Sequence, residues 1–81
     1  MIVAPVPSFT KEDFQKLSTD ALISFMSDQG VILSNLTQKI LADEEIDGDA
    51  LLLMKPEELQ KIKVPAGAVA KIFSKIPSNF F

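Results

Sequence analysis

The chain contains no cysteine, histidine, tryptophan, tyrosine or arginine among its 81 residues. Without cysteine it can form neither a disulfide framework nor a thiolate metal site. Because histidine is missing too, the usual residues of zinc and haem sites and of Ser-His-Asp or Cys-His catalysis are absent. An enzyme would have to work with carboxylates, lysines and hydroxyls alone. We therefore expect no catalytic site, no metal site and no cofactor.

Positive charge is scarce as well, with 8 basic residues against 11 acidic ones and a net charge of −3. Nucleic-acid binding depends on neutralising phosphates, and the bidentate fork that arginine offers to phosphate or guanine is missing. A lipid surface would need a basic amphipathic face, for which Lys71 and Lys75 are too few. The composition argues against nucleic acids and membranes as partners.

Long apolar runs are also missing, since no stretch approaches the roughly 18 residues of a membrane span. The start, MIVAPVPSF, has no basic region, and Pro5 and Pro7 interrupt its apolar residues. It therefore does not match a secretory signal. From these features we expect an intracellular protein, either cytoplasmic or nuclear.

A length of 81 residues predicts a single domain. Two prolines and no helical period predict an extended or disordered tail over residues 1–8. The helical domain is expected over residues 9–77, because Pro77 stops the last helix. Residues 78–81 form the C-terminal end, in which Phe80 and Phe81 are either loose or folded back onto the core.

Capping residues and apolar spacing predict a compact, all-α bundle of five short helices. Thr10 and Asp13 resemble a capping box at the first helix, Ser18 can begin the next helical stretch, and Gly30 can end it. The pattern leaves open whether these two stretches are separate helices or one bent helix. Val31–Leu33 is interpreted as a buried connection. Later helices are expected from Ser34 to about Leu41, from about Gly48 to Leu53, from Pro56, and from about Gly67 to Ile76.

The apolar positions that recur at helical spacing define the predicted core. These residues are Leu17, Leu22, Phe25, Met26, Leu36, Ile40, Ile46, Leu51, Leu52, Leu59, Ile62, Val69, Ile72, Phe73 and Ile76.

Three stretches of the chain resemble one known family. EEIDGDALLLMKPEEL is similar to the centre of a sterile alpha motif (SAM) domain, with its Ile-Asp-Gly turn, Leu-rich short helix and following acidic helix. IKVPAGAVAKIFSKI resembles the start of that family's last helix, and LSTDALISFMSDQGV resembles its first. The resemblance covers about Leu17 to Ile76. Leu17 and Phe25 stand where the family often has tryptophan, and no Arg or Lys directly follows Gly67.

The resemblance implies a five-helix SAM-like bundle that mediates protein–protein association. SAM domains that self-associate often join an acidic mid-loop surface to a surface at the start of the last helix. Such a contact is head-to-tail, so its partner is another SAM domain, a second copy of this chain or another protein. The implied acidic mid-loop surface consists of Asp43, Glu44, Glu45, Asp47 and Asp49. The implied end-helix surface consists of Lys61, Lys63, Val64, Ala66, Ala68 and Lys71.

The acidic residues and the start of the last helix also allow other interpretations. The acidic residues can be a solvated turn, with Asp47 serving only as a helix cap. A calcium loop that starts at Asp43 would place Gly48 at position 6, but its twelfth residue is Met54 instead of a bidentate Glu. An RNA-hairpin-binding SAM domain would need a basic cluster at the last helix, where this chain has Val69. Protein association is the function that the sequence favours.

Overall fold

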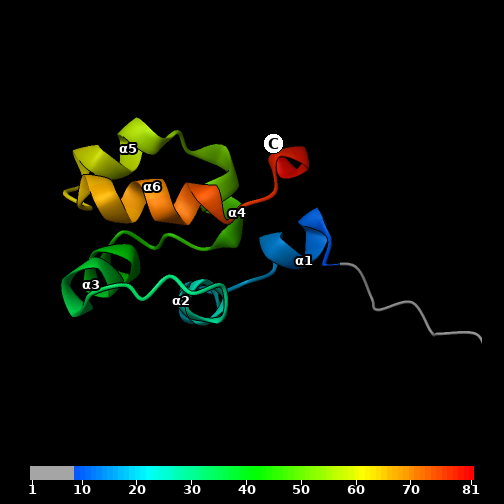
Figure 1. The fold of residues 1–81 in the computed structure, drawn as a ribbon, viewed down its shortest axis with the longest axis horizontal. Coiled ribbons are helices and arrows are strands. Elements are labelled where there is room, and N and C mark those ends of the chain that lie inside the picture. Colours follow the sequence, from blue (N-terminus) through cyan, green and yellow to red (C-terminus); the bar gives the residue numbers. More distant parts are fainter. Residues whose placement is uncertain (1–8) are drawn as a thin grey trace, which may run out of the picture.

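The computed structural model describes residues 9–81, and the predicted N-terminal tail, residues 1–8, lies outside the described residues. Within residues 9–81 the fold is all-helical and forms a small single domain, as the sequence predicts. α6 runs through the middle of the view in Figure 1, with α5 on one side and α2 and α3 on the other. The described elements are α1 (Lys11–Gln15), α2 (Thr19–Asp28), α3 (Asn35–Asp43), α4 (Gly48–Leu53), α5 (Pro56–Lys61), α6 (Ala66–Ser74) and the 3-10 turn η1 (Ser78–Phe80).

Side-chain caps begin the first four helices. The Thr10 hydroxyl accepts the Asp13 N–H at 3.2 Å, and the Asp13 carboxylate accepts the Thr10 N–H at 3.0 Å, which confirms the capping box. This bond from the Thr10 backbone, aided by the Thr10 side chain, lowers the pKa of Asp13. Ser18, Ser34 and Asp47 accept from backbone N–H groups three residues further on. These caps satisfy donors that a helix start leaves free.

The N-terminal segment forms a helix of its own, so the described chain has six α-helices where the sequence led us to count five. The Leu17 carbonyl accepts the Gly48 N–H at 3.0 Å, which ties the end of α1 to the start of α4. A Cβ at Gly48 would overlap the Phe14 carbonyl oxygen. Glycine at this position therefore permits the close approach of α4 to α1.

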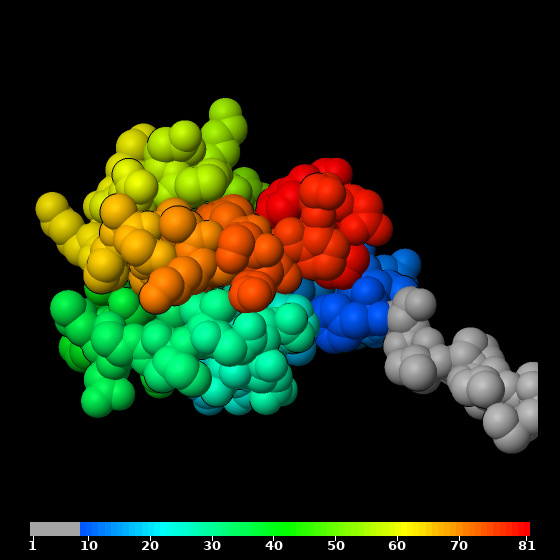
Figure 2. Space-filling view, viewed as in Figure 1, coloured from blue at the N-terminus to red at the C-terminus, as the bar shows by residue number. Residues whose placement is uncertain are grey.

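Phenylalanine rings join the two ends of the described chain. Phe14 is fully buried and makes edge-to-face contacts with Phe25 and Phe80, with ring centroids 5.5 and 5.9 Å apart. Phe9 stacks on Phe25 at 5.1 Å. Phe80 is only 4% exposed, so the C-terminal turn folds back onto the core. Figure 2 shows this last segment, in red, seated against the α1 segment in blue.

The predicted core is confirmed at most positions and wrong at Leu36, which is 63% exposed. Thr37 takes the inward position on α3 instead, because Leu33, Thr37 and Leu41 follow the four-residue spacing of the buried face. The buried connection predicted over Val31–Leu33 is confirmed at Val31 and Leu33 and wrong at Ile32, which is 79% exposed. Other buried residues that the predicted core omitted are Phe14, Leu41, Val64 and Phe80. Several residues of the predicted core are only partly buried against it: Leu17, Phe25, Ile40, Leu52, Ile62 and Phe73.

Replacing Ile72 with alanine tests the core assignment. Ile72 is 2% exposed on α6, so Ile72→Ala should lower the free energy of unfolding by about 2–5 kcal/mol, since it removes packed methylenes and leaves a cavity. Leu36→Ala should change it by no more than about 0.5 kcal/mol, because Leu36 is a surface residue. Urea unfolding of both variants measures the difference. Equal losses for the two variants would contradict this packing.

Candidate interaction surfaces

Three of the helices end in the same way, and their ends shape the two predicted surfaces. After α2, the Val31 N–H reaches the Met26 carbonyl at 2.8 Å, across Gly30, whose φ is 86°. α3 ends with a bond of 2.8 Å from the Ile46 N–H to the Leu41 carbonyl, and α5 with one of 3.1 Å from Val64 to Leu59. This is the Schellman motif, in which the residue at C′ adopts a left-handed conformation.

Each motif turns the next apolar residue into the core. Val31, Ile46 and Val64 follow the left-handed residues and are 3–5% exposed. Each packs as the hydrophobic partner that commonly accompanies this helix end. For Val64 this is a correction to the predicted end-helix surface, because a side chain that is 3% exposed has almost no area to offer a partner.

The left-handed positions themselves are occupied differently in the three motifs. Gly30 fills the first, but Glu45 with φ 54° and Lys63 with φ 76° fill the other two. A side chain in this conformation costs roughly 1–2 kcal/mol. Glu45 and Lys63 are exposed, and each lies in one of the two predicted surfaces.

The acidic mid-loop surface extends from the end of α3 to the first turn of α4. Glu44, Glu45 and Asp49 are exposed there. Asp43 is partly neutralised by Lys39, whose ammonium lies 3.5 Å from its carboxylate on the same helix. The fifth predicted residue has a structural role that the sequence also allowed.

That residue is Asp47, which is half-buried and caps α4. Its Oδ1 accepts the Ala50 N–H at 2.8 Å. Replacing Asp47 would therefore weaken α4 as well as the surface charge. Exposed Glu44, Glu45 and Asp49 remain the better probes of recognition.

Asp20 joins this surface, although the sequence analysis did not include it. A shallow hollow is lined by Ser18, Thr19, Asp20, Ala42, Glu45 and Asp47. The Thr19 hydroxyl donates to the Ile46 carbonyl at 2.9 Å, which holds the start of α2 against the loop after α3. Asp20 precedes Glu45 by 25 residues and Asp47 by 27 residues in the chain, so its place depends on the packing of the start of α2 against the loop after α3, and no local signal marks it.

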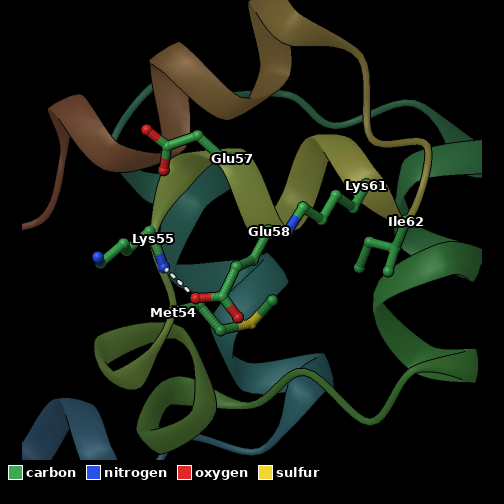
Figure 3. A pocket seen from close by; sticks show the side chains of 6 residues that line it. All are labelled: Met54, Lys55, Glu57, Glu58, Lys61 and Ile62. Atoms are coloured by element: carbon green, nitrogen blue, oxygen red, sulfur yellow. Dashed lines mark hydrogen bonds between the residues drawn. The ribbon is translucent and has the colours of Figure 1, made fainter.

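The end-helix residues separate into two places. Lys61 lines a groove between the end of α4 and α5, together with Met54, Lys55, Glu57, Glu58 and Ile62. In Figure 3 the Lys61 side chain extends back along α5 on the side of Glu58, whose carboxylate accepts the Lys55 N–H at 3.2 Å. Ala68 and Lys71 instead line a different groove at the start of α6. Exposed Lys63 and Ala66 lie on the connection from α5 and at the first residue of α6.

The groove at the start of α6 is largely apolar. It is lined by Val31, Ile32, Leu33, Pro65, Gly67 and Ala68, together with Ser34, Thr37 and Lys71. Hydrogen bonds fix its α3 side: the Ser34 hydroxyl donates to the Thr37 hydroxyl at 3.0 Å, and the Gln38 amide donates to the Leu33 carbonyl at 2.9 Å. We call this hollow the α6 groove.

α3 separates the two surfaces. Ala42 and the loop that follows it line the acidic hollow, whereas Ser34 and Thr37 at the other end of the helix line the α6 groove. Nine helical residues span about 14 Å. The acidic mid-loop surface and the α6 groove are therefore two sites, and a contact between them would join two molecules.

Within residues 9–81 this arrangement supports neither a metal site nor a membrane-spanning helix. Among residues 9–81 no three acidic side chains gather in a way that could hold a metal ion. The calcium-loop geometry is replaced by helix, since α4 begins at Gly48 and Leu51 is buried in the core. In the same part of the chain, every helix is too short or too polar to cross a bilayer.

Comparison with known protein families identifies the family of this chain. The sequence model of the family described as the SAM-like domain matches residues 2–78, nearly the whole length. The chain belongs to the SAM-like domain family. No curated protein and no solved structure matched the chain. SAM-like domains are typically protein-interaction modules without catalytic activity, and the two surfaces are therefore the features of this SAM-like domain to test.

The left-handed residues of this SAM-like domain allow a matched test of their cost. Glu45→Gly and Lys63→Gly should each raise the free energy of unfolding by about 0.5–1 kcal/mol, because glycine adopts positive φ without a clash. Gly30→Ala, at the equivalent place after α2, should lower it by about 1 kcal/mol. Thermal and urea unfolding check all three signs. Destabilisation by both glycine variants would show that the native side chains stabilise the fold.

Proposed function

We propose that this SAM-like domain associates with proteins through two surfaces, the acidic mid-loop surface and the end-helix surface at the start of α6. The partner is another SAM domain, a second copy of this chain or another protein that presents a complementary face. The observation that carries the proposal is the placement of opposite charges at the two ends of α3: exposed Glu44, Glu45 and Asp49 at one end, and Lys71 at the other. The role is binding, without catalysis, metal or cofactor.

Head-to-tail geometry follows from two different surfaces on one molecule. A contact between unlike surfaces need not close on itself, so it can extend into a chain of copies. The acidic mid-loop surface carries more charge than the end-helix surface, which relies on Lys63 and Lys71. We therefore propose weak self-association, or tighter binding to a partner with a more basic face.

The cellular role is also a proposal. Association modules of this kind suit an intracellular signalling, scaffold or regulatory protein. The lack of cysteine is compatible with a cytoplasmic or nuclear location. The alternative of RNA-hairpin binding is less favoured, because the start of α6 offers Lys63 and Lys71 but no arginine.

Complementary charge reversals test the two-surface arrangement. Glu44→Lys with Asp49→Lys removes the acidic mid-loop surface and keeps the Asp47 cap, while Lys63→Glu with Lys71→Glu removes the end-helix charges. Sedimentation from micromolar to millimolar concentration should show weaker self-association for each variant alone. A mixture of the two variants should form a 1:1 complex, because each keeps the surface that the other lacks. Association of the parent chain should weaken as salt rises.

The matched control is Glu12→Lys with Glu57→Lys, which makes the same charge change at exposed first-turn residues of α1 and α5. It should associate as the parent chain does. Equal weakening by the control, or a mixture without a 1:1 complex, would exclude the two-surface contact. A parent chain that is monomeric at every concentration would exclude self-association. Shift mapping against the end-helix faces of other SAM domains would then test the heterotypic form.

A further inference from the structure

Large apolar side chains are exposed at several places in residues 9–81, and two of them bear on the proposed contact. Leu53, the last residue of α4, is 79% exposed, and Ile32, which lines the α6 groove, is also 79% exposed. Phe9 and Phe81 have ring partners within the chain, Phe25 and Phe73. Single exposed leucines are common on protein surfaces. Leu53 is relevant to the proposed contact because it lies next to the acidic mid-loop surface.

Leu53 shares a face of α4 with the acidic mid-loop surface. Asp49 lies four residues earlier on the same helix, and residues at this spacing are neighbours on one face. Both side chains are exposed. The acidic mid-loop surface therefore continues into an apolar tip, with a carboxylate about one helical turn from a leucine.

The α6 groove presents the complementary chemistry. Its accessible apolar area comes from exposed Ile32 and Pro65 and half-buried Ala68, which lie over the buried side chains of Val31 and Leu33. Lys71 supplies a cation. α6 has no acidic residue in its first turn and no side-chain cap, so its first amide groups also favour an anion. The hydrogen bonds of Ser34, Thr37 and Gln38 described above keep the α3 side of the groove in shape without a ligand. No residue of α4 lines the groove, so Leu53 does not fill the groove of its own molecule.

We propose that Leu53 of one copy inserts into the α6 groove of a second copy, with Asp49 beside Lys71. This inference rests on the proposed function and adds the partner and the anchor of the contact. The occupant is a second copy because this chain carries both halves, an apolar tip with an acid and an apolar groove with a base. The two halves belong to different surfaces, so each copy can give its leucine to one neighbour and accept one from another.

An apolar anchor makes a different prediction from charge attraction alone. Screening at about 1 M salt shortens the Debye length to about 3 Å and weakens exposed charge pairs. Apolar burial is not screened by salt, and a leucine that enters a groove stabilises the contact in proportion to the apolar area that it removes from water. The parent chain should therefore keep measurable self-association at high salt, and that residual association should depend on Leu53.

The test compares two exposed leucines by sedimentation at low and high salt. Leu53→Gln removes the apolar tip but keeps a good helix former at this position. It should weaken self-association by at least about tenfold and abolish the self-association that remains at high salt. Leu36→Gln makes the same change on α3 at a residue that is 63% exposed and does not line the groove. It should associate as the parent chain does. Circular dichroism should show the same helicity for both variants.

A second pair of variants tests the groove itself. Ala68→Glu places a carboxylate in the groove, where it fills space and repels Asp49, while an acid in the first turn of α6 is favoured by the helix dipole. Ala70→Glu adds the same charge at an exposed residue outside the groove. Ala68→Glu should abolish the self-association that Ala70→Glu retains. In a mixture with Leu53→Gln, it should restore a 1:1 complex, since Ala68→Glu keeps a native Leu53 and Leu53→Gln keeps a native groove.

The outcomes separate this inference from the proposed function. Parent-like association of Leu53→Gln, together with loss in the Glu44 and Asp49 reversal, would overturn the anchor and leave a purely ionic contact. A parent chain that is monomeric to millimolar concentration would overturn the second copy as occupant. Equal loss for Leu36→Gln and Leu53→Gln would also overturn the inference, because the effect would then not be specific to the tip of α4.

Discussion

The left-handed turn that ends α2, α3 and α5 is the constraint on which the rest of the structure depends. Each of these helices is short, between six and ten residues, and short helices are marginal in water by themselves. The turn places one more apolar residue in the core directly after each left-handed residue, namely Val31, Ile46 and Val64. Burial of these side chains in the core stabilises helices that intrinsic helix propensity alone would not keep folded.

The same turns set what the surface can offer. Because the residue after each turn points inward, the residue in the turn points outward, and in two of the three cases it is charged. Glu45 and Lys63 occupy positions where glycine would be less strained. Strained residues of this kind are retained more often where the side chain has a function. Their opposite charges, one on each surface, agree with association between unlike faces.

α3 acts as the spacer of the molecule. Its C-terminal end meets the start of α2 at the acidic hollow, and its N-terminal end forms one side of the α6 groove. The hydrogen bond from the Ser34 hydroxyl to the buried Thr37 hydroxyl fixes that second end. A single helix therefore sets the distance between the two surfaces, so a change in the packing of α3 would move both.

The sequence by itself determined the all-helical class, the helix starts at residues such as Thr10 and Ser34, the turn at Gly30 and the SAM-like family. These features depend on local chemistry: a cap needs one hydroxyl or carboxylate within three residues, and a glycine suits positive φ whatever surrounds it. The tertiary structure alone decided that Leu36 faces solvent, that Val64 and Phe80 are buried, and that Asp20 joins the acidic surface. Apolar spacing marks a helix face but does not say which of two neighbouring positions meets the core, since that depends on how the other helices cross it. The α6 groove likewise required two segments at least 28 residues apart, and only packing brings such segments together.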